Sequence, residues 1–135
     1  MTDFKTTAVR DAVVLWKALS DFANDPKNVA TVVRKKHVLL TPQVFALETL
    51  DDETSHCPFC FFDRVEGNDD CRTCLGANLG FPTDSSGKAN CNADNTPFDK
   101  FDSARVSVNH EGCNEMFKMT LLVADHHQVF VDDLL

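Results

Sequence analysis

The sequence predicts a small, mainly α-helical domain, in which helices from both ends of the chain pack together around an irregular, zinc-stapled middle segment. Three observations predict this fold. Apolar residues recur at three- and four-residue steps near both ends of the chain. That periodicity disappears in residues 56–98, which hold five of the six cysteines and four of the five glycines. Four of these cysteines form two Cys-x-x-Cys pairs, which is typical of a metal site. A small α+β fold with one short hairpin is the alternative.

The length of 135 residues fits one domain. We divide residues 1–135 into N-terminal helices (1–53), a zinc-binding loop segment (54–98) and a C-terminal helix with a tail (99–135). The chain begins without the basic start and apolar run of a signal peptide. No stretch approaches the ~18 apolar residues that span a membrane. We therefore expect a cytoplasmic protein without a membrane partner, in which thiols bind metal more often than they form disulfides.

The first helix is predicted over residues 7–23, where Trp16 is the only tryptophan. Its apolar face comprises Val9, Ala12, Val13, Trp16, Leu19 and Ala23. Asn24-Asp25-Pro26 ends this helix. We interpret Trp16 as a core anchor, with a partner-binding hot spot as the alternative.

Two shorter elements should follow. Pro26 can begin a second helix capped by Asp25, with Val29, Val32 and Val33 buried, although a strand through Val38-Leu39-Leu40 competes with its end. Thr41-Pro42 begins a short helix whose apolar face would comprise Val44, Phe45, Leu47 and Leu50. Between them, Arg34-Lys35-Lys36-His37 is the one basic cluster. It is either a solvated helix end or a contact for phosphate or an acidic partner.

Helical periodicity returns from Pro97 onward. Its apolar positions are Phe101, Ala104 and Val108 on one face and Met116, Met119, Leu122 and Val123 on another. Gly112 lies between the two sets, where we expect a break or a kink. The tail 127–131 either extends the helix or forms a short edge strand.

The two cysteine pairs predict a closed zinc site. The candidate ligands are Cys57, Cys60, Cys71 and Cys74, with ten residues between the pairs. Four thiolates complete tetrahedral zinc and leave no position for water or substrate, so such a site stabilises structure rather than catalysing a reaction. Iron in the same ligand set, disulfides and free thiols are the alternatives.

Two cysteines are left over, Cys91 and Cys113. Cys91 could replace one of the four ligands. His110 and Cys113, with Cys91 and His126 or His127, could form a second metal site, whereas buried thiols are the simpler interpretation for both cysteines.

The sequence contains no complete catalytic pattern. Asp125-His126-His127 resembles a general base with its carboxylate, but no nucleophile is identifiable near it. The glycines around Lys88 do not match a phosphate loop. A zinc-knuckle nuclease would need an array of histidine and asparagine residues after the cysteines, and Asn109-His110 is the one pair that resembles it. We therefore expect no enzyme.

The chain resembles a group of small phage-encoded zinc-knuckle proteins. The likeness comprises Leu15-Trp16 in an N-terminal helix, the two cysteine pairs, and Cys91 followed by Thr96-Pro97-Phe98 and a C-terminal helix. The group often has proline after the fourth cysteine, where this chain has Leu75, so the local turn can differ. The resemblance implies a virus-encoded accessory protein that acts in the host bacterial cytoplasm, and it implies no activity.

The net charge restricts the class of partner that the protein can bind. The formal net charge is −8, but residues 41–135 carry six Lys/Arg and seventeen Asp/Glu, a net of −11. Such a body repels phosphate backbones, which disfavours nucleic acid. We expect an acidic zinc-stabilised interaction protein that binds and inhibits a host macromolecule, with mimicry of nucleic-acid charge as one route. The alternative is a zinc-ribbon-like nucleic-acid binder that uses Arg34, Lys35, Lys36, Arg64 and Arg72.

Overall fold

Helices dominate the computed structural model of the protein, which describes residues 4–39, 41–48, 59, 74–76, 79, 81–83, 85 and 93–135. The elements are α1 (Phe4–Asn24), η1 (Pro26–Asn28), η2 (Lys35–His37), α2 (Pro42–Phe45), α4 (Pro97–Phe101), α5 (Val106–His126) and η3 (Asp132–Leu134), where η denotes a 3-10 turn. Within these ranges the structure contains no continuous strand. The mainly α-helical class is therefore confirmed.

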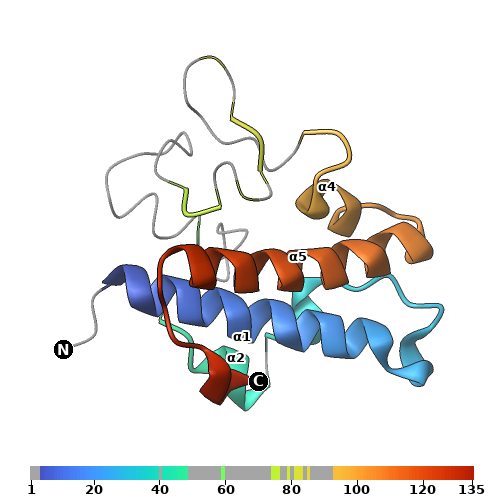
Figure 1. The fold of residues 1–135 in the computed structure, drawn as a ribbon. Coiled ribbons are helices and arrows are strands. Elements are labelled where there is room, and N and C mark those ends of the chain that lie inside the picture. The colour runs from blue at the N-terminus through green and yellow to red at the C-terminus, as the bar shows by residue number, and fades with distance from the viewer. Residues whose placement is uncertain are drawn as a thin grey trace.

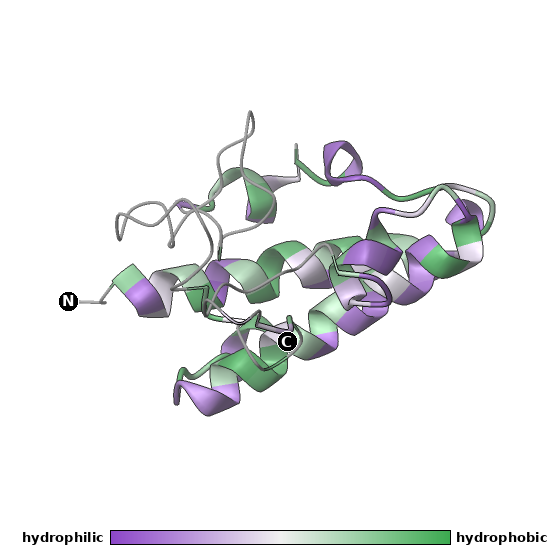
Figure 2. Ribbon diagram, turned by 90° about the horizontal axis from the view of Figure 1, so that it is seen from above, coloured by the Kyte–Doolittle hydropathy of each residue, from purple (hydrophilic) through white to green (hydrophobic). Residues whose placement is uncertain are grey.

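Two helices of 21 residues each, α1 and α5, form the body of the fold. They lie side by side and run in opposite directions, with α4 packed over the N-terminal half of α5 and α2 on the far side of α1 (Figure 1). Polar and apolar residues alternate along both long helices (Figure 2), because each buries one face and exposes the other. The predicted packing of N- and C-terminal helices is confirmed.

The core is centred on Trp16, which is fully buried. Its ring meets Phe101 edge to face at a centroid distance of 4.9 Å and Phe98 at 6.3 Å. Edge-to-face pairs of this kind add ~0.5–1.5 kcal/mol each to the burial of the rings. The predicted role of Trp16 as a core anchor is therefore confirmed, and so is the helix around it, which extends slightly beyond the predicted residues 7–23 at both ends.

The predicted second helix is wrong. Only a single 3-10 turn forms at Pro26–Asn28, with Asp25 capping it by accepting a hydrogen bond from the Lys27 nitrogen at 2.9 Å. Val29 is 72% exposed, whereas Val33 is fully buried. β-branched residues favour extended backbone, and the backbone of Val33 binds a side chain of α5 instead of continuing a helix. The competing strand is also absent at Val38 and Leu39, which form a turn after η2.

The short helix α2 begins at Pro42, as the Thr-Pro pair predicts. It ends after four residues, and only Val44 is buried, whereas Phe45 is 78% exposed. The predicted burial of Phe45 is therefore wrong. Leu47 is half-buried, and Leu50 lies outside the described residues.

Helix α5 contradicts the expected break at Gly112, which lies buried in the middle of a continuous helix. The chain instead breaks at residues 102–105, between α4 and α5. A Cβ on Gly112 would lie 2.6 Å from the Lys100 carbonyl carbon and from the Phe101 Cα. Glycine is needed here so that the backbone of α4 can contact α5, not to bend the helix.

Burial along α5 follows the prediction in part. Met116, Met119 and Val123 are buried, but Leu122 is 57% exposed and Ala104 is exposed in the connection before the helix. The tail is neither of the predicted forms. Helix α5 ends at His126, Gln128 adopts a positive φ of 58°, and the chain continues irregularly to η3 with Val129 and Val131 buried.

Candidate functional site

The predicted zinc ligands fall mostly outside the described residues, because Cys57, Cys60 and Cys71 are not among them. The fourth, Cys74, is buried with 9% of its surface exposed. The two residues after it contact the helical body: Leu75 shares a backbone hydrogen bond with His127, and a Cβ on Gly76 would lie 3.5 Å from the Met119 methyl group. The second cysteine pair thus ends against α5.

The candidates for a second metal site do not converge. Cys113 is fully buried, and burial raises the pKa of its thiol to about 12. The His110 Nε2 lies 2.7 Å from the Thr31 carbonyl oxygen, to which it donates. His126 lies thirteen residues beyond Cys113 on the same helix, a rise of ~20 Å, which is too far to share one ion. Among the described residues there is no group of three or more potential metal ligands, and Cys91 lies outside them.

The two histidines at the end of α5, His126 and His127, lie against each other. The rings of His126 and His127 meet edge to face at 4.9 Å. Burial lowers the pKa of His127, and its hydrogen bond with the Leu75 backbone opposes that shift. The hydrogen bond and the burial show that His127 joins the cysteine segment to α5.

Arg34, the first residue of the basic cluster, has a structural role. Its guanidinium donates to the Phe101 carbonyl at 2.8 Å and to the Ser103 carbonyl at 3.2 Å, and it lies 5.9 Å from the centre of the Phe101 ring. These are the carbonyls at the C-terminal end of α4, which otherwise lack helical partners. The hydrogen bonds of the Arg34 guanidinium therefore stabilise the fold. Of the other cations proposed to contact nucleic acid, Lys36 is exposed, and Arg64 and Arg72 lie outside the described residues.

Asn109 is a buried polar residue whose role the sequence did not reveal. Its amide nitrogen donates to the carbonyls of Phe101 at 2.6 Å and Val33 at 3.0 Å, and its amide oxygen accepts from the Val33 nitrogen at 2.7 Å. Asn109 is fully buried, so these bonds form away from water. It joins three segments, and it is not part of a catalytic histidine–asparagine array. A lone asparagine among apolar helical positions was the available signal.

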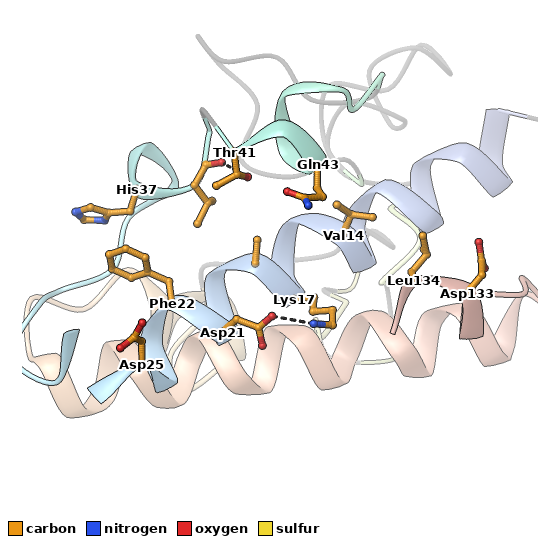
Figure 3. Close-up of a pocket in the computed structure, with 12 residues that line it drawn as sticks. Val14, Lys17, Asp21, Phe22, Asp25, His37, Thr41, Gln43, Asp133 and Leu134 are labelled. Carbon is orange, nitrogen blue, oxygen red and sulfur yellow. Dashed lines mark hydrogen bonds and ion pairs between the residues drawn. The ribbon is translucent and has the colours of Figure 1, made fainter. Parts of the chain in front are cut away.

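One recess with described walls is a groove along the outer face of α1 (Figure 3), with a volume of about 670 Å³. Three segments form it: α1, the stretch from η2 to α2, and the tail. Its lining residues are Val14, Lys17, Ala18, Asp21, Phe22, Asp25, His37, Val38, Thr41, Gln43, Asp133 and Leu134. A sequence pattern could not find this groove, because its walls are distant in the chain and only the fold brings them together.

Aromatic stacking and two ion pairs shape the groove. Phe22 and His37 stack with ring centroids 4.9 Å apart, and the His37 Nδ1 accepts a hydrogen bond from the Arg34 nitrogen at 2.9 Å. Lys17 donates to Asp21 at 2.8 Å. The guanidinium of Arg10, outside the groove, binds both carboxylate oxygens of Asp133 at 2.9 and 2.6 Å and so fixes the tail on α1.

The electrostatics of the groove are acidic. The hydrogen bond from Arg10 lowers the pKa of Asp133, which therefore stays ionised at neutral pH. Asp25 accepts a hydrogen bond from a backbone nitrogen and forms no ion pair with any described residue. Lys17 neutralises Asp21 and Arg10 neutralises Asp133, so Asp25 supplies the lining negative charge that no described cation balances.

A smaller recess of about 340 Å³ continues along α1 toward its N-terminus. Thr7, Arg10, Asp11, Ala46 and Glu48 line it. The Asp11 carboxylate accepts a hydrogen bond from the Glu48 nitrogen at 3.1 Å, which holds the end of the α2 segment on α1. The acidic, partly apolar surface thus follows α1 over much of its length.

Comparison of the chain with models of protein families, with curated protein sequences and with solved structures finds no significant match. In the described part of the chain, no helix combines the length and the apolar character needed to cross a membrane.

Proposed function

We propose that the protein is a non-enzymatic, zinc-stabilised interaction protein, encoded by a virus, that binds and inhibits a host macromolecule in the bacterial cytoplasm. The observation that carries this proposal is the groove on α1, whose lining combines apolar side chains with the carboxylate of Asp25, which forms no ion pair among the described residues. Ligand sites in proteins are concave and mainly apolar, with a few polar groups that fix orientation. The acidic charge of the whole chain supports a protein partner over a nucleic acid.

Zinc is proposed to hold the middle segment through Cys57, Cys60, Cys71 and Cys74. The spacing of the two pairs supports this ligand set, and the burial of Cys74 supports a structural role. Structural zinc binds with an apparent ~10–16 kcal/mol, which exceeds the ~5–15 kcal/mol net stability of a domain. We expect about one equivalent of zinc in the purified chain, and a lower melting temperature after chelation. A chain without zinc, or an unchanged melting temperature with chelator, would remove this part of the proposal.

The test of the interaction is affinity capture from bacterial lysate with the tagged chain, eluted by competition with untagged chain. We expect a specific host protein that binds again as a purified component and loses its activity on binding. A parallel capture with the Cys57→Ser/Cys60→Ser variant locates the contact: loss assigns it to the zinc-dependent middle, and retention assigns it to the helical body. If untagged chain displaces no protein, the proposal fails.

The nucleic-acid-binding alternative is weakened by Arg34, whose guanidinium binds the carbonyls at the end of α4. Its remaining described cations, Lys35 and Lys36, belong to a single 3-10 turn. Phosphate contacts make affinity fall steeply with salt. A gel shift that shows tight, salt-sensitive binding of duplex or single-stranded DNA would restore this alternative, and no shift at low salt would remove it.

A further inference from the structure

The groove on α1 has the length of a short peptide. It follows α1 from Val14 to Asp25, eleven residues and therefore a rise of ~17 Å. An extended chain of about five residues covers that distance at ~3.3 Å per residue. The volume of about 670 Å³ lies within the ~300–1,000 Å³ typical of ligand pockets. The groove can therefore hold one short segment but not a folded domain.

Apolar side chains from all three walls indicate that the face of the occupant buried in the groove is apolar. Val14, Ala18 and Phe22 come from successive turns of α1, at positions that share one helical face. Val38 and Leu134 complete this apolar set from the opposite walls. Val14, Ala18, Phe22 and Leu134 are only half-buried, so they retain surface that a partner could cover. Covering it favours binding by ~25 cal/mol per Å² of apolar area.

The charged residues of the groove determine which charge an occupant should carry. Lys17 and Arg10 are already held by Asp21 and Asp133. Asp25 forms no ion pair among the described residues and lies at the end of the groove where α1 finishes. A basic side chain there would gain an opposite charge, and a phosphate or an acidic peptide would be repelled.

We propose that the groove binds a short basic segment of a partner protein, with apolar side chains on Val14, Ala18 and Phe22 and a lysine or arginine at Asp25. The argument is charge complementarity combined with the apolar lining. This proposal deepens the proposed function by naming the site and the partner's chemistry, and it rests on that function. The net charge of the whole chain, −8, attracts such a segment over a longer range.

Two fluorescent peptides test the proposal against the full-length, zinc-loaded chain. The first alternates leucine with lysine, so that an extended chain presents its leucines on one face, and the second replaces every lysine with glutamate. We expect the lysine peptide to bind in fluorescence anisotropy and the glutamate peptide not to bind. Amide chemical shifts of the labelled chain should change mainly at the groove residues when the lysine peptide is added.

Two pairs of variants separate the groove from general acidity. Asp25→Asn keeps the helix cap, because asparagine caps as well as aspartate, and we expect ~two- to fivefold weaker binding. The matched control is Asp125→Asn, an exposed charge on α5 outside the groove. Ala18→Arg fills the groove and should weaken binding more than ~tenfold. Its control, Ser107→Arg, makes the same charge change at an exposed position of α5.

The outcomes decide between sites and partners. Equal effects of each variant and its control, or binding of both peptides alike, would overturn the proposal, as would absence of binding. Shift changes at the groove on adding a DNA duplex would overturn it in favour of a nucleic-acid partner. If a captured host protein binds the wild type and Ala18→Arg equally, the proposed function stands and the groove is not its site. If Ala18→Arg does not fold, the Asp25→Asn pair decides alone.

Discussion

Replacing Gly112 with alanine should destabilise the protein, although alanine is the better helix former. The new Cβ would lie 2.6 Å from the Lys100 carbonyl carbon and the Phe101 Cα, whereas ordinary contacts begin at 3.4 Å. Helix α4 would therefore have to move away from α5 by about 0.8 Å or more. That movement stretches the 2.6 Å hydrogen bond from Asn109 to the Phe101 carbonyl, which is buried.

The expected loss follows from three terms. Overpacking costs ~1–3 kcal/mol, and weakening a buried hydrogen bond costs a further ~1–3 kcal/mol. Alanine returns ~1 kcal/mol through helix propensity. The sum is a loss of about 3 kcal/mol, which corresponds to a fall of ~10–15 °C in the melting temperature of a chain of this size.

Thermal and urea denaturation followed by circular dichroism measure this effect. Ser107→Ala, at an exposed position of the same helix, is the control and should leave stability unchanged or slightly higher. A Gly112→Ala variant as stable as the wild type would show that α4 does not contact α5 at this position. The reasoning about the close approach of the two helices would then be wrong.

Two further predictions concern buried polar groups. Asn109→Ala should lower the free energy of unfolding by ~3–5 kcal/mol in a urea titration, because it leaves the backbone groups of Val33 buried without their partner. Asn114→Ala is the control: its hydrogen bonds are only part-buried, so the same titration should show a loss of ~1 kcal/mol. Equal losses from the two variants would contradict the argument. The Cys113 thiol should resist alkylation in the native chain at pH 8 and react in denaturant, as measured by mass spectrometry of its peptide, since its pKa is raised to about 12. The thiol of the unfolded chain has a pKa near 9.0. This group's contribution to stability should therefore be constant below pH 9 and fall between pH 9 and about 12. Cys113→Ala should lose that part of the pH dependence, and alkylation of the native chain would refute the burial.

The long helices could be predicted from the sequence, because their apolar positions are set by local periodicity. Residues 7–23 and the buried Trp16 illustrate this. Errors arose where distant residues decide the outcome. Val29–Val33 has a helical spacing of apolar residues, yet Val33 is held in an irregular backbone by Asn109, seventy-six positions away. Gly112 was wrongly predicted to break a helix. Glycine is required there because the backbone of α4 lies close to it, and the sequence does not reveal that contact.

The candidate sites divide in the same way. Cysteine spacing predicts a ligand set without any knowledge of the fold, and for Cys57, Cys60 and Cys71 it stays a prediction. The role of Arg34 depended on the position of the α4 carbonyls, which only the packed structure reveals. The groove combines α1 with residues near positions 40 and 133, so no local pattern could indicate it.

One carbonyl, that of Phe101, accepts hydrogen bonds from both Arg34 and Asn109. These bonds join the N-terminal third of the chain to its C-terminal third, so the two ends of the long intervening segment are fixed by the helical body itself. The closure entropy of a loop with fixed ends grows slowly with its length, by ~0.6 kcal/mol for each doubling. Insertions between residues 48 and 93 should therefore cost the helical body little where they leave the buried residues Phe59, Leu75 and Phe81 in place. Such an arrangement separates changes in the length of this segment from the stability of the helices that hold its ends.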